Sequence, residues 1–182
     1  MKRSLALLIL VSATMAGAQT PDTSGTIFLV RHAEKISDAK DALLSKTGER
    51  RAACLAQTLR DAHIGAIYVT QVKRTQQTAE PLAKKLGIQP TIVNGDDTAA
   101  LAGEIKKDIA TKNLLVVGHS DTLPKVLSQI GISNPPAIGR NDYDLLFAVS
   151  NLNGKPELTT LHYCPSSQQA SSKGTSEMRH MR

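Results

Sequence analysis

Short apolar runs alternate along the chain with longer segments in which apolar residues recur every three or four positions. The short runs are typical of β-strands and lie at residues 26–31, 66–70, 90–93, 113–120, 144–150 and 157–164. The longer segments predict helices at residues 47–63, 74–87, 97–110 and 121–131. This alternation predicts an α/β fold, a three-layer α/β/α sandwich with a mostly parallel central sheet.

Three residues mark the expected ends and irregularities of the first two helices. Thr47 is a suitable N-cap for the first helix, and Gly87 is a natural C-terminal stop for the second. Pro81 lies inside the second helix, where it lacks a backbone N–H and its ring crowds the preceding turn. We therefore expect a kink or an interruption at Pro81.

Basic and polar side chains follow three of the predicted strands at the point where each strand ends. Arg31 and His32 end the first strand, and His119 follows the fourth. Thr70 ends the second strand and leads to Arg74 at the start of a helix. Open α/β sheets bind ligands outside the carboxyl ends of their strands. The sequence therefore predicts that these side chains converge on one site.

Two arginines and two histidines at one edge of a sheet would form a site for an anion. The planar fork of a guanidinium group matches phosphate oxygens and stays charged at any accessible pH. Neighbouring positive charge opposes protonation of an imidazole, so His32 would keep a free lone pair near neutral pH. A neutral imidazole that faces a phosphorus atom is a nucleophile.

Three motifs in this order resemble branch 1 of the histidine phosphatase superfamily, the phosphoglycerate-mutase-like branch. The family's Arg-His-Gly corresponds to "RHA", with Ala33 in place of Gly. Its S-x-x-x-R-x-x-Q-T stretch corresponds to "TQVKRTQQT", with Thr70 in the Ser position, and its G-H-S to residues 118–120. "LSKTGERRA" is similar to the family's helix entry. The resemblance extends from about residue 26 to residue 164.

The resemblance implies a mechanism. His32 would attack the phosphoryl group and become a phosphohistidine, which water would then hydrolyse. Arg31, Arg74 and His119 would hold the phosphoryl oxygens and stabilise the negative charge of the transition state. Neither a cofactor nor a metal ion is expected, because the arginines supply the positive charge.

The general acid that would protonate the leaving oxygen is left unassigned. Larger relatives use a Glu in an insert after the third strand, and the corresponding segment, "VNGDDTAALAGEI", is short here. A helix cap or a surface charge is the alternative reading of each available carboxylate. The candidates are Asp96, Asp97, Glu104, Glu34 and Asp121.

We expect a metal-independent phosphatase that hydrolyses phosphate monoesters. A mutase is less favoured, because retention and reorientation of a phosphoglycerate usually depend on the longer insert. Two alternatives stay open, a non-catalytic phosphate-binding module and a phosphatase for phosphohistidine proteins. The substrate is not specified by any motif. Three cations would either favour anionic groups or remain solvated surface charges: Lys35, Lys73 and Arg140.

The two ends of the chain differ from the middle. Residues 1–18 combine a basic start, the apolar run "LALLILV" and small residues ending in A-x-A, which is typical of a secretory signal peptide cleaved after Ala18. Residues 19–164 form the expected domain, and residues 165–182, rich in Ser and Gln, an expected disordered tail. We therefore expect a periplasmic or secreted protein without stable membrane insertion after cleavage.

Charge and cysteine content limit the expected partners. The formal net charge is +6, of which the leader contributes +2 and the tail +2, so the domain keeps only +2. With 3% aromatic residues, this balance argues against a nucleic-acid partner. A phosphorylated small molecule or envelope component is expected instead. Cys54 occupies an apolar position of a predicted helix, far in sequence from Cys164, so we expect two free thiols in preference to a disulfide.

Overall fold

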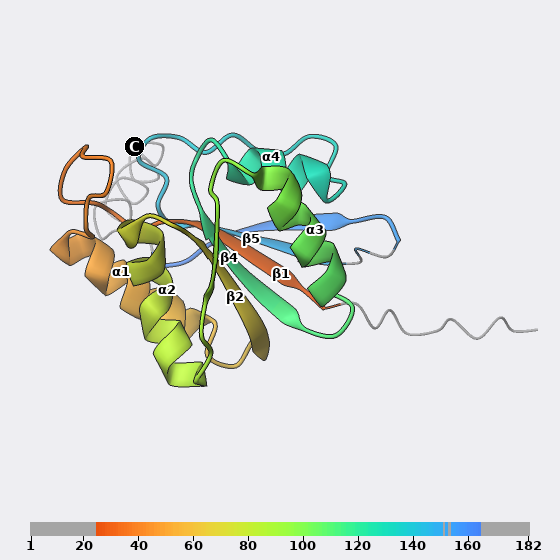
Figure 1. The fold of residues 1–182 in the computed structure, drawn as a ribbon, viewed down its shortest axis with the longest axis horizontal. Helices are drawn as coiled ribbons and strands as arrows, with labels where there is room; N and C mark the ends of the chain where they lie inside the picture. The colour runs from red at the N-terminus through yellow and green to blue at the C-terminus, as the bar shows by residue number, and fades with distance from the viewer. Residues whose placement is uncertain (1–24, 151, 153, 165–182) are drawn as a thin grey trace, which may run out of the picture.

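The structure is a computed structural model that describes residues 25–150, 152 and 154–164 (Figure 1). The expected signal peptide, residues 1–18, and the expected tail, residues 165–182, lie outside the described residues. Within the described part, no helix is long and apolar enough to cross a membrane.

Six strands form one sheet in the order β3-β2-β4-β1-β5-β6. They are β1 (Ile27–Arg31), β2 (Ile64–Thr70), β3 (Thr91–Val93), β4 (Asn113–Gly118), β5 (Leu145–Ser150) and β6 (Glu157–His162). The first four strands run parallel to one another, whereas β5 pairs antiparallel with both β1 and β6. The predicted α/β fold with a mostly parallel sheet is confirmed.

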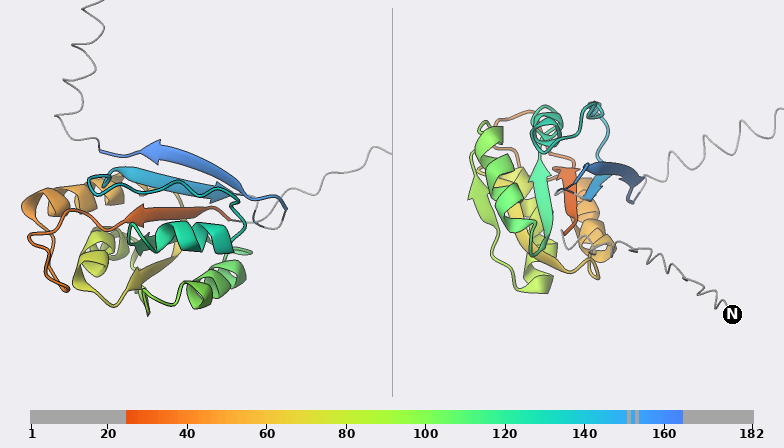
Figure 2. Two further views of the ribbon diagram at one scale, coloured as in Figure 1. Left: turned by 90° about the horizontal axis from the view of Figure 1, so that it is seen from above. Right: turned by 90° about the vertical axis from the view of Figure 1, so that its right-hand side faces the viewer.

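Helices cover both faces of the sheet (Figure 2). They are α1 (Lys46–Thr58), α2 (Lys73–Leu86), α3 (Thr98–Asp108) and α4 (Leu123–Gln129). Side chains alternate between the two faces of a strand, so β1 contributes to two cores. Ile27 and Leu29 pack with residues of α3 and α4, and Val30 packs with residues of α1 and α2. This two-sided burial explains why the sequence of β1 is apolar at consecutive positions.

The first two helices differ from the sequence-based expectation at the N-cap of α1 and at Pro81 in α2. Ser45, not Thr47, is the N-cap of α1, because its hydroxyl accepts a hydrogen bond from the N–H of Gly48 at 3.2 Å. Gly87 ends α2 in the left-handed conformation, with φ of 67°, as expected. Of the kink or interruption expected at Pro81, the interruption is wrong, since α2 continues through this residue. Burial of the neighbouring helix face offsets the one backbone hydrogen bond that proline cannot donate.

Gly48 allows α1 to begin directly against the chain segment that follows β1. A Cβ atom at this position would lie 2.2 Å from the carbonyl oxygen of Glu34, which is far inside contact distance. The N–H of Ser45 donates to the same carbonyl at 2.8 Å. The start of α1 is therefore tied to the segment that carries His32.

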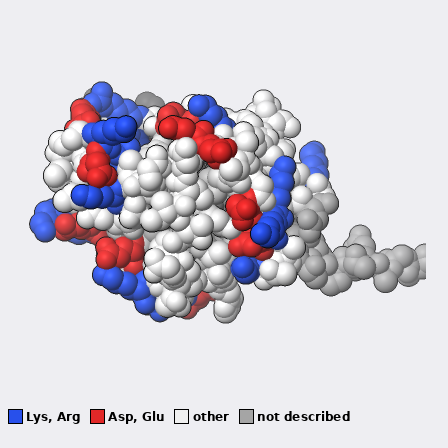
Figure 3. All heavy atoms as spheres, viewed as in Figure 1, with Lys and Arg blue, Asp and Glu red and all other residues white. Residues whose placement is uncertain are grey.

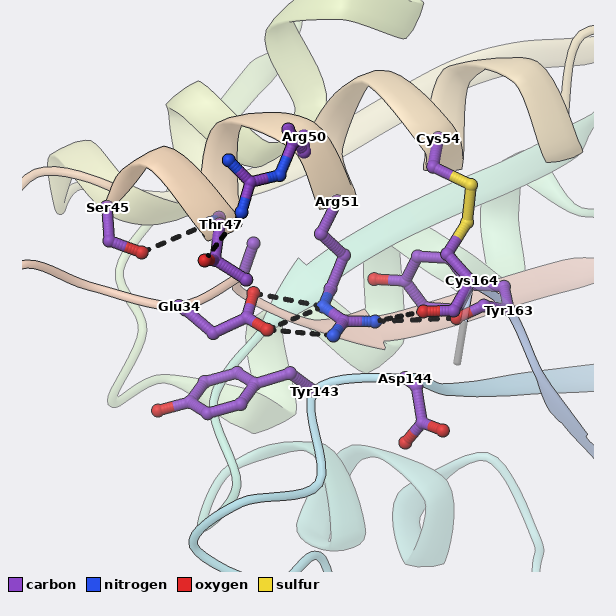
Figure 4. Close-up of polar contacts among 12 residues, drawn as sticks. Glu34, Ser45, Thr47, Arg50, Arg51, Cys54, Tyr143, Asp144, Tyr163 and Cys164 are labelled. Carbon is purple, nitrogen blue, oxygen red and sulfur yellow. Dashed lines mark hydrogen bonds and ion pairs between the residues drawn. A yellow bond between two sulfur atoms is a disulfide. The ribbon is translucent and has the colours of Figure 1, made fainter. Parts of the chain in front are cut away.

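A disulfide joins Cys54 on α1 to Cys164 after β6, so the expectation of two free thiols is wrong (Figure 4). The two Cα atoms lie 6.4 Å apart, although 110 positions separate them in the sequence. The helical pattern indicated only that Cys54 occupies an apolar position of the helix. It could not show that the last strand ends beside that helix.

Basic and acidic side chains are intermixed on the face seen in Figure 3, and an uncharged area spreads between them. Positive charge is not gathered into one large patch on this face. Any strong positive potential there has to be local.

Replacement of both cysteines by serine should lower the free energy of unfolding by about 2–4 kcal/mol, because the bridge closes a long loop in the unfolded chain. Urea denaturation of the oxidised wild type and of the Cys54→Ser/Cys164→Ser variant measures this difference. Wild type treated with a reductant is the matched control and should behave as the variant does. Equal stability of all three proteins would contradict the prediction.

Candidate active site

The parallel pairing of β1 with β4 places the two histidines side by side. Arg31 is the register partner of Gly118, and the N–H of His32 donates to the carbonyl of Gly118 at 2.9 Å. His119 follows Gly118, and its ring centroid lies 5.4 Å from that of His32. Arg74, the second residue of α2, reaches the same place, with Nη2 3.4 Å from Nδ1 of His119. The structure thus brings together all four residues singled out in the sequence.

His32 is held as a neutral imidazole with one free nitrogen. Its Nδ1 lies 2.8 Å from the carbonyl oxygen of Ala33, which can only accept, so Nδ1 carries the proton. Nε2 therefore holds the lone pair. Burial lowers the pKa of His32 to about 3, and the positive charges of Arg74 and Arg31 act in the same direction. The residue is 4% exposed. Because the imidazole is neutral, its Nε2 could attack an electrophile without first losing a proton.

Hydrogen bonds orient His119 through both ring nitrogens. Arg74 can only donate, so Nδ1 of His119 accepts from it, and Nε2–H donates to Oγ1 of Thr70 at 3.0 Å. Oγ1 of Thr70 lies 2.9 Å from Oγ1 of Thr75, and either hydroxyl can be the donor. Burial lowers the pKa of His119 to about 4, with Arg74 as a further cause.

The hydroxyl pair gives His119 a second hydrogen-bonding state. If the hydroxyl of Thr70 turns to donate to Nε2, the proton of the neutral ring resides on Nδ1 instead. Nδ1–H then faces the same space as the guanidinium group of Arg74. A neutral His119 can in this way donate a hydrogen bond to an anion, which a fixed Nε2–H tautomer could not do.

Two guanidinium groups at this site each have a buried Nε–H without a partner. Nη1 of Arg31 donates to the carbonyls of Gly139 (2.9 Å) and Arg140 (2.8 Å), and Nη1 of Arg74 donates to the carbonyl of Lys40 (2.7 Å). The Nε atoms of both arginines are buried without a hydrogen-bond partner within the described part of the chain. A buried polar group without a partner is costly, so this arrangement favours a bound anion with several oxygens.

Tyr143 completes the wall beside Arg31, and sequence reasoning did not assign it a role. The Cζ atom of Arg31 lies 4.2 Å from the centroid of the Tyr143 ring, within the range of a cation–π contact. The same ring lies 6.1 Å from that of His32. No motif marks this tyrosine, because it comes from the long segment between α4 and β5.

Hydroxyl and amide side chains of α2 hold the site together, which the sequence analysis also did not foresee. Oγ1 of Thr78 accepts from the N–H of Ala33 at 2.9 Å and donates to the carbonyl of Arg74 at 2.7 Å. Oε1 of Gln77 accepts from the N–H of Leu44 at 2.9 Å. The "RTQQT" stretch therefore fixes the backbone next to His32 as well as supplying Arg74.

Glu34 is committed to an ion pair with Arg51 and is not available as a general acid (Figure 4). Nε and Nη2 of Arg51 donate to both carboxylate oxygens at 2.8–3.0 Å. Nη1 of the same guanidinium donates to the carbonyl of Cys164 at 2.9 Å. The side chains of Arg51 and Glu34 are 7% and 20% exposed, so this pair lies largely out of solvent.

The other carboxylates named as candidate acids divide into two groups. Asp97 caps α3 by accepting from the N–H of Ala100 at 2.9 Å, and Glu104 lies 4.0 Å from Lys107 on the outside of α3. Asp121 and Asp96 lie near enough to His119 that their charges raise its pKa, against the larger lowering effect of burial. Among the described residues, no three His, Cys, Asp or Glu side chains are grouped to hold a metal ion.

Part of the chain that contributes to this arrangement is similar to a known family. Residues 27–95 match the model of the histidine phosphatase superfamily (branch 1). The matched segment contains His32 and both arginines, whereas His119 lies beyond it.

A curated relative matches this chain over a similar length. "Probable phosphoglycerate mutase GpmB" of Yersinia enterocolitica is 37% identical over 70 residues, which cover 35% of this chain. The match spans only a third (33%) of that relative's own length.

Solved structures with the same fold cover most of the described domain. The protein histidine phosphatase SixA in complex with tungstate has a TM-score of 0.59 at 17% identity, covering 75% of this chain and 96% of the other. A mycobacterial glucosyl-3-phosphoglycerate phosphatase has a TM-score of 0.62 at 12% identity, covering 76% and 99%. Phosphoserine phosphatase of Entamoeba histolytica has a TM-score of 0.61 at 15% identity, covering 78% and 98%. At these identities the likeness establishes the fold.

Replacement of Thr70 by valine should weaken binding of inorganic phosphate about fivefold to tenfold, the size of one hydrogen bond. Valine keeps the shape but removes the hydroxyl that orients His119. Calorimetric titration with phosphate measures the change, and Thr70→Ser is the matched control that should retain affinity. Equal affinity of Thr70→Val and wild type would show that this hydroxyl does not orient the ring.

The two depressed histidine pKa values should make the protein less stable as the pH falls. The unfolded chain takes up protons below about pH 6.5, but the folded imidazoles resist until about pH 4 and 3. The free energy of unfolding should therefore fall by about 2 kcal/mol per imidazole between pH 7 and pH 5. Urea denaturation of wild type and His32→Asn at both pH values measures it. An equal fall in both proteins would mean that the pKa of His32 is not depressed.

Proposed function

We propose that this chain is a phosphatase that hydrolyses phosphate monoesters through a phosphohistidine on His32. The observation that carries the proposal is the free Nε2 of a buried neutral imidazole beside two guanidinium groups with unpartnered Nε–H groups. A phosphoryl group offers an electrophilic phosphorus to the imidazole nitrogen and oxygen atoms to the guanidinium groups.

The reaction proceeds in two displacements. The Nε2 lone pair of His32 forms a bond to phosphorus while the bond to the leaving oxygen breaks, and that oxygen takes up a proton. Water then attacks the phosphorus, the P–N bond breaks, and inorganic phosphate and neutral His32 are released. Arg31, Arg74 and the Nδ1–H of His119 stabilise the charge on the phosphoryl oxygens in both steps.

We favour Asp121 or Asp96 as the source of the proton for the leaving oxygen. Their charges act on His119, whereas Glu34 and Asp97 are engaged in structural hydrogen bonds. We also favour hydrolysis over mutase activity. Only residues 94–97 connect β3 to α3, which leaves little chain to enclose a phosphoenzyme and a reoriented product.

Export to the periplasm or medium is part of the proposal. The first 18 residues have the composition of a signal peptide, and the Cys54–Cys164 bridge is of the kind that persists in oxidising compartments. The substrate would then be a phosphorylated small molecule or envelope component. We propose that turnover needs no metal ion, since the arginines neutralise the phosphoryl charge.

A phosphatase for phosphohistidine proteins is the second candidate. The likeness to SixA, described as a protein histidine phosphatase, motivates it. The chemistry is compatible, because the departing imidazole of a phosphohistidine can be protonated by solvent beforehand. Such a substrate needs no enzyme carboxylic acid, and none of the five candidate carboxylates forms a hydrogen bond to His32 or His119 in the described structure.

Removal of the nucleophile should abolish turnover. Residues 19–182 assayed with a generic aryl phosphate in the presence of a chelator should release phosphate, and His32→Asn should lower kcat/KM by at least about a thousandfold. His63→Asn is the matched control, because His63 is exposed and has φ of 48°, a conformation that Asn tolerates. Rapid quenching into alkaline denaturant should trap a phosphoenzyme in wild type and not in His32→Asn.

The other outcomes distinguish the alternatives. Turnover that survives His32→Asn would exclude the mechanism. Phosphate binding without turnover of any ester would indicate a binding module. Turnover of a phosphohistidine protein but not of aryl phosphates would favour the second candidate.

A further inference from the structure

A hollow of about 560 Å³ lies directly beside the candidate active site. Residues 35–38, which follow β1, form one wall of the hollow. Residues 140, 141 and 143, which precede β5, form the other. The lining of the hollow includes Arg31, Lys35, Asp38, Arg140, Asn141 and Tyr143. We propose that this hollow receives the leaving group of the substrate and selects leaving groups that carry an anionic group of their own, such as a carboxylate. This inference rests on the proposed phosphatase function.

Arg31 and Tyr143 connect the hollow to the reacting centre. Arg31 lines the hollow, and its neighbour His32 is the proposed nucleophile. The Tyr143 ring packs against the guanidinium of Arg31 and lies 6.1 Å from the His32 ring. A group attached to a phosphorus atom at His32 therefore lies near the Tyr143 ring, with the hollow beyond it.

The charge of the hollow is positive. Three of its lining residues are cations, namely Arg31, Lys35 and Arg140, and Asp38 is the one carboxylate among the lining residues. The phosphoryl group engages Arg31 in the proposed reaction, so the other two cations remain for the leaving group. Asp38 offsets one of these two positive charges, and a neutral leaving group would leave the other uncompensated.

Asp38 orients the two remaining cations. Its Oδ1 accepts from Nζ of Lys35 at 2.8 Å, and its Oδ2 lies 3.5 Å from Nη2 of Arg140. One carboxylate cannot use all the donors of an ammonium and a guanidinium group. The side chain of Lys35 is 24% exposed, so it is held in place, whereas that of Arg140 is 85% exposed and free to adjust to a ligand.

The backbone on both sides of the hollow is fixed. Lys35 forms a β-bridge with Leu44, and the N–H of Ile36 donates to the carbonyl of Leu43 at 3.0 Å. On the opposite wall, the carbonyl of Arg140 accepts from Arg31 at 2.8 Å. The cations are therefore presented from two anchored segments.

Two matched esters test the inference. The leaving groups of 3-carboxyphenyl phosphate and 3-carbamoylphenyl phosphate have nearly the same size and differ in charge. Wild type at low salt should prefer the carboxylate ester in kcat/KM by about fivefold, the effect of one partly exposed charge pair. The ratio of kcat/KM for the carboxylate ester to kcat/KM for the carbamoyl ester should fall toward one in Arg140→Gln and further in Lys35→Gln/Arg140→Gln. Lys106→Gln removes the same charge from an exposed position on α3 and should keep the ratio.

A measurement on wild type alone tests the same charge effect without relying on the folding of a variant. Raising the salt from about 20 mM to about 500 mM should reduce the ratio, because exposed charge pairs are screened. Hydrolysis of both esters with a ratio near one, or with a ratio that Lys35→Gln/Arg140→Gln does not change, would overturn the inference and leave the phosphatase standing. Hydrolysis of neither ester would overturn the proposed hydrolysis of phosphate monoesters and the inference with it.

Discussion

The register of the parallel pairing between β1 and β4 is the constraint on which the site depends. Because Arg31 is in register with Gly118, the residues that follow both strands emerge at the same height, and the two imidazoles lie 5.4 Å apart. Both strands are buried on both faces. A shift in register by one residue would move each apolar side chain to the opposite face and disrupt both cores. The hydrophobic core thus sets the geometry of the chemical groups at its edge.

Burial and positive charge act together at that edge. Each guanidinium group is anchored by backbone carbonyls through one nitrogen and keeps its Nε–H unpartnered. The same environment keeps both imidazoles neutral by lowering the pKa of His32 to about 3 and of His119 to about 4. A bound phosphoryl group would satisfy the arginines and meet a free lone pair on His32, so in the proposed reaction one arrangement would provide both binding and attack.

A second set of contacts ties the segment that carries His32 to the far end of the domain. Glu34, two residues after His32, binds Arg51 of α1, and Arg51 also binds the carbonyl of Cys164, whose sulfur is bonded to Cys54 of the same helix. The close approach of Gly48 to Glu34 belongs to the same contact. The disulfide therefore closes a ring of interactions around the start of α1, and stability and site geometry are coupled through this helix.

The sequence by itself determined the alternation of strands and helices, the two-sided burial of the central strands, and the convergence of Arg31, His32, Arg74 and His119. These follow from local periodicity together with the rule that parallel strands end at one edge. Only the tertiary structure decided that Ser45 caps α1, that Cys54 meets Cys164, that Glu34 is engaged by Arg51, and that Tyr143 borders the site. Most of these contacts join segments far apart in sequence, and their partners depend on how helices and long connections pack, which no local pattern records.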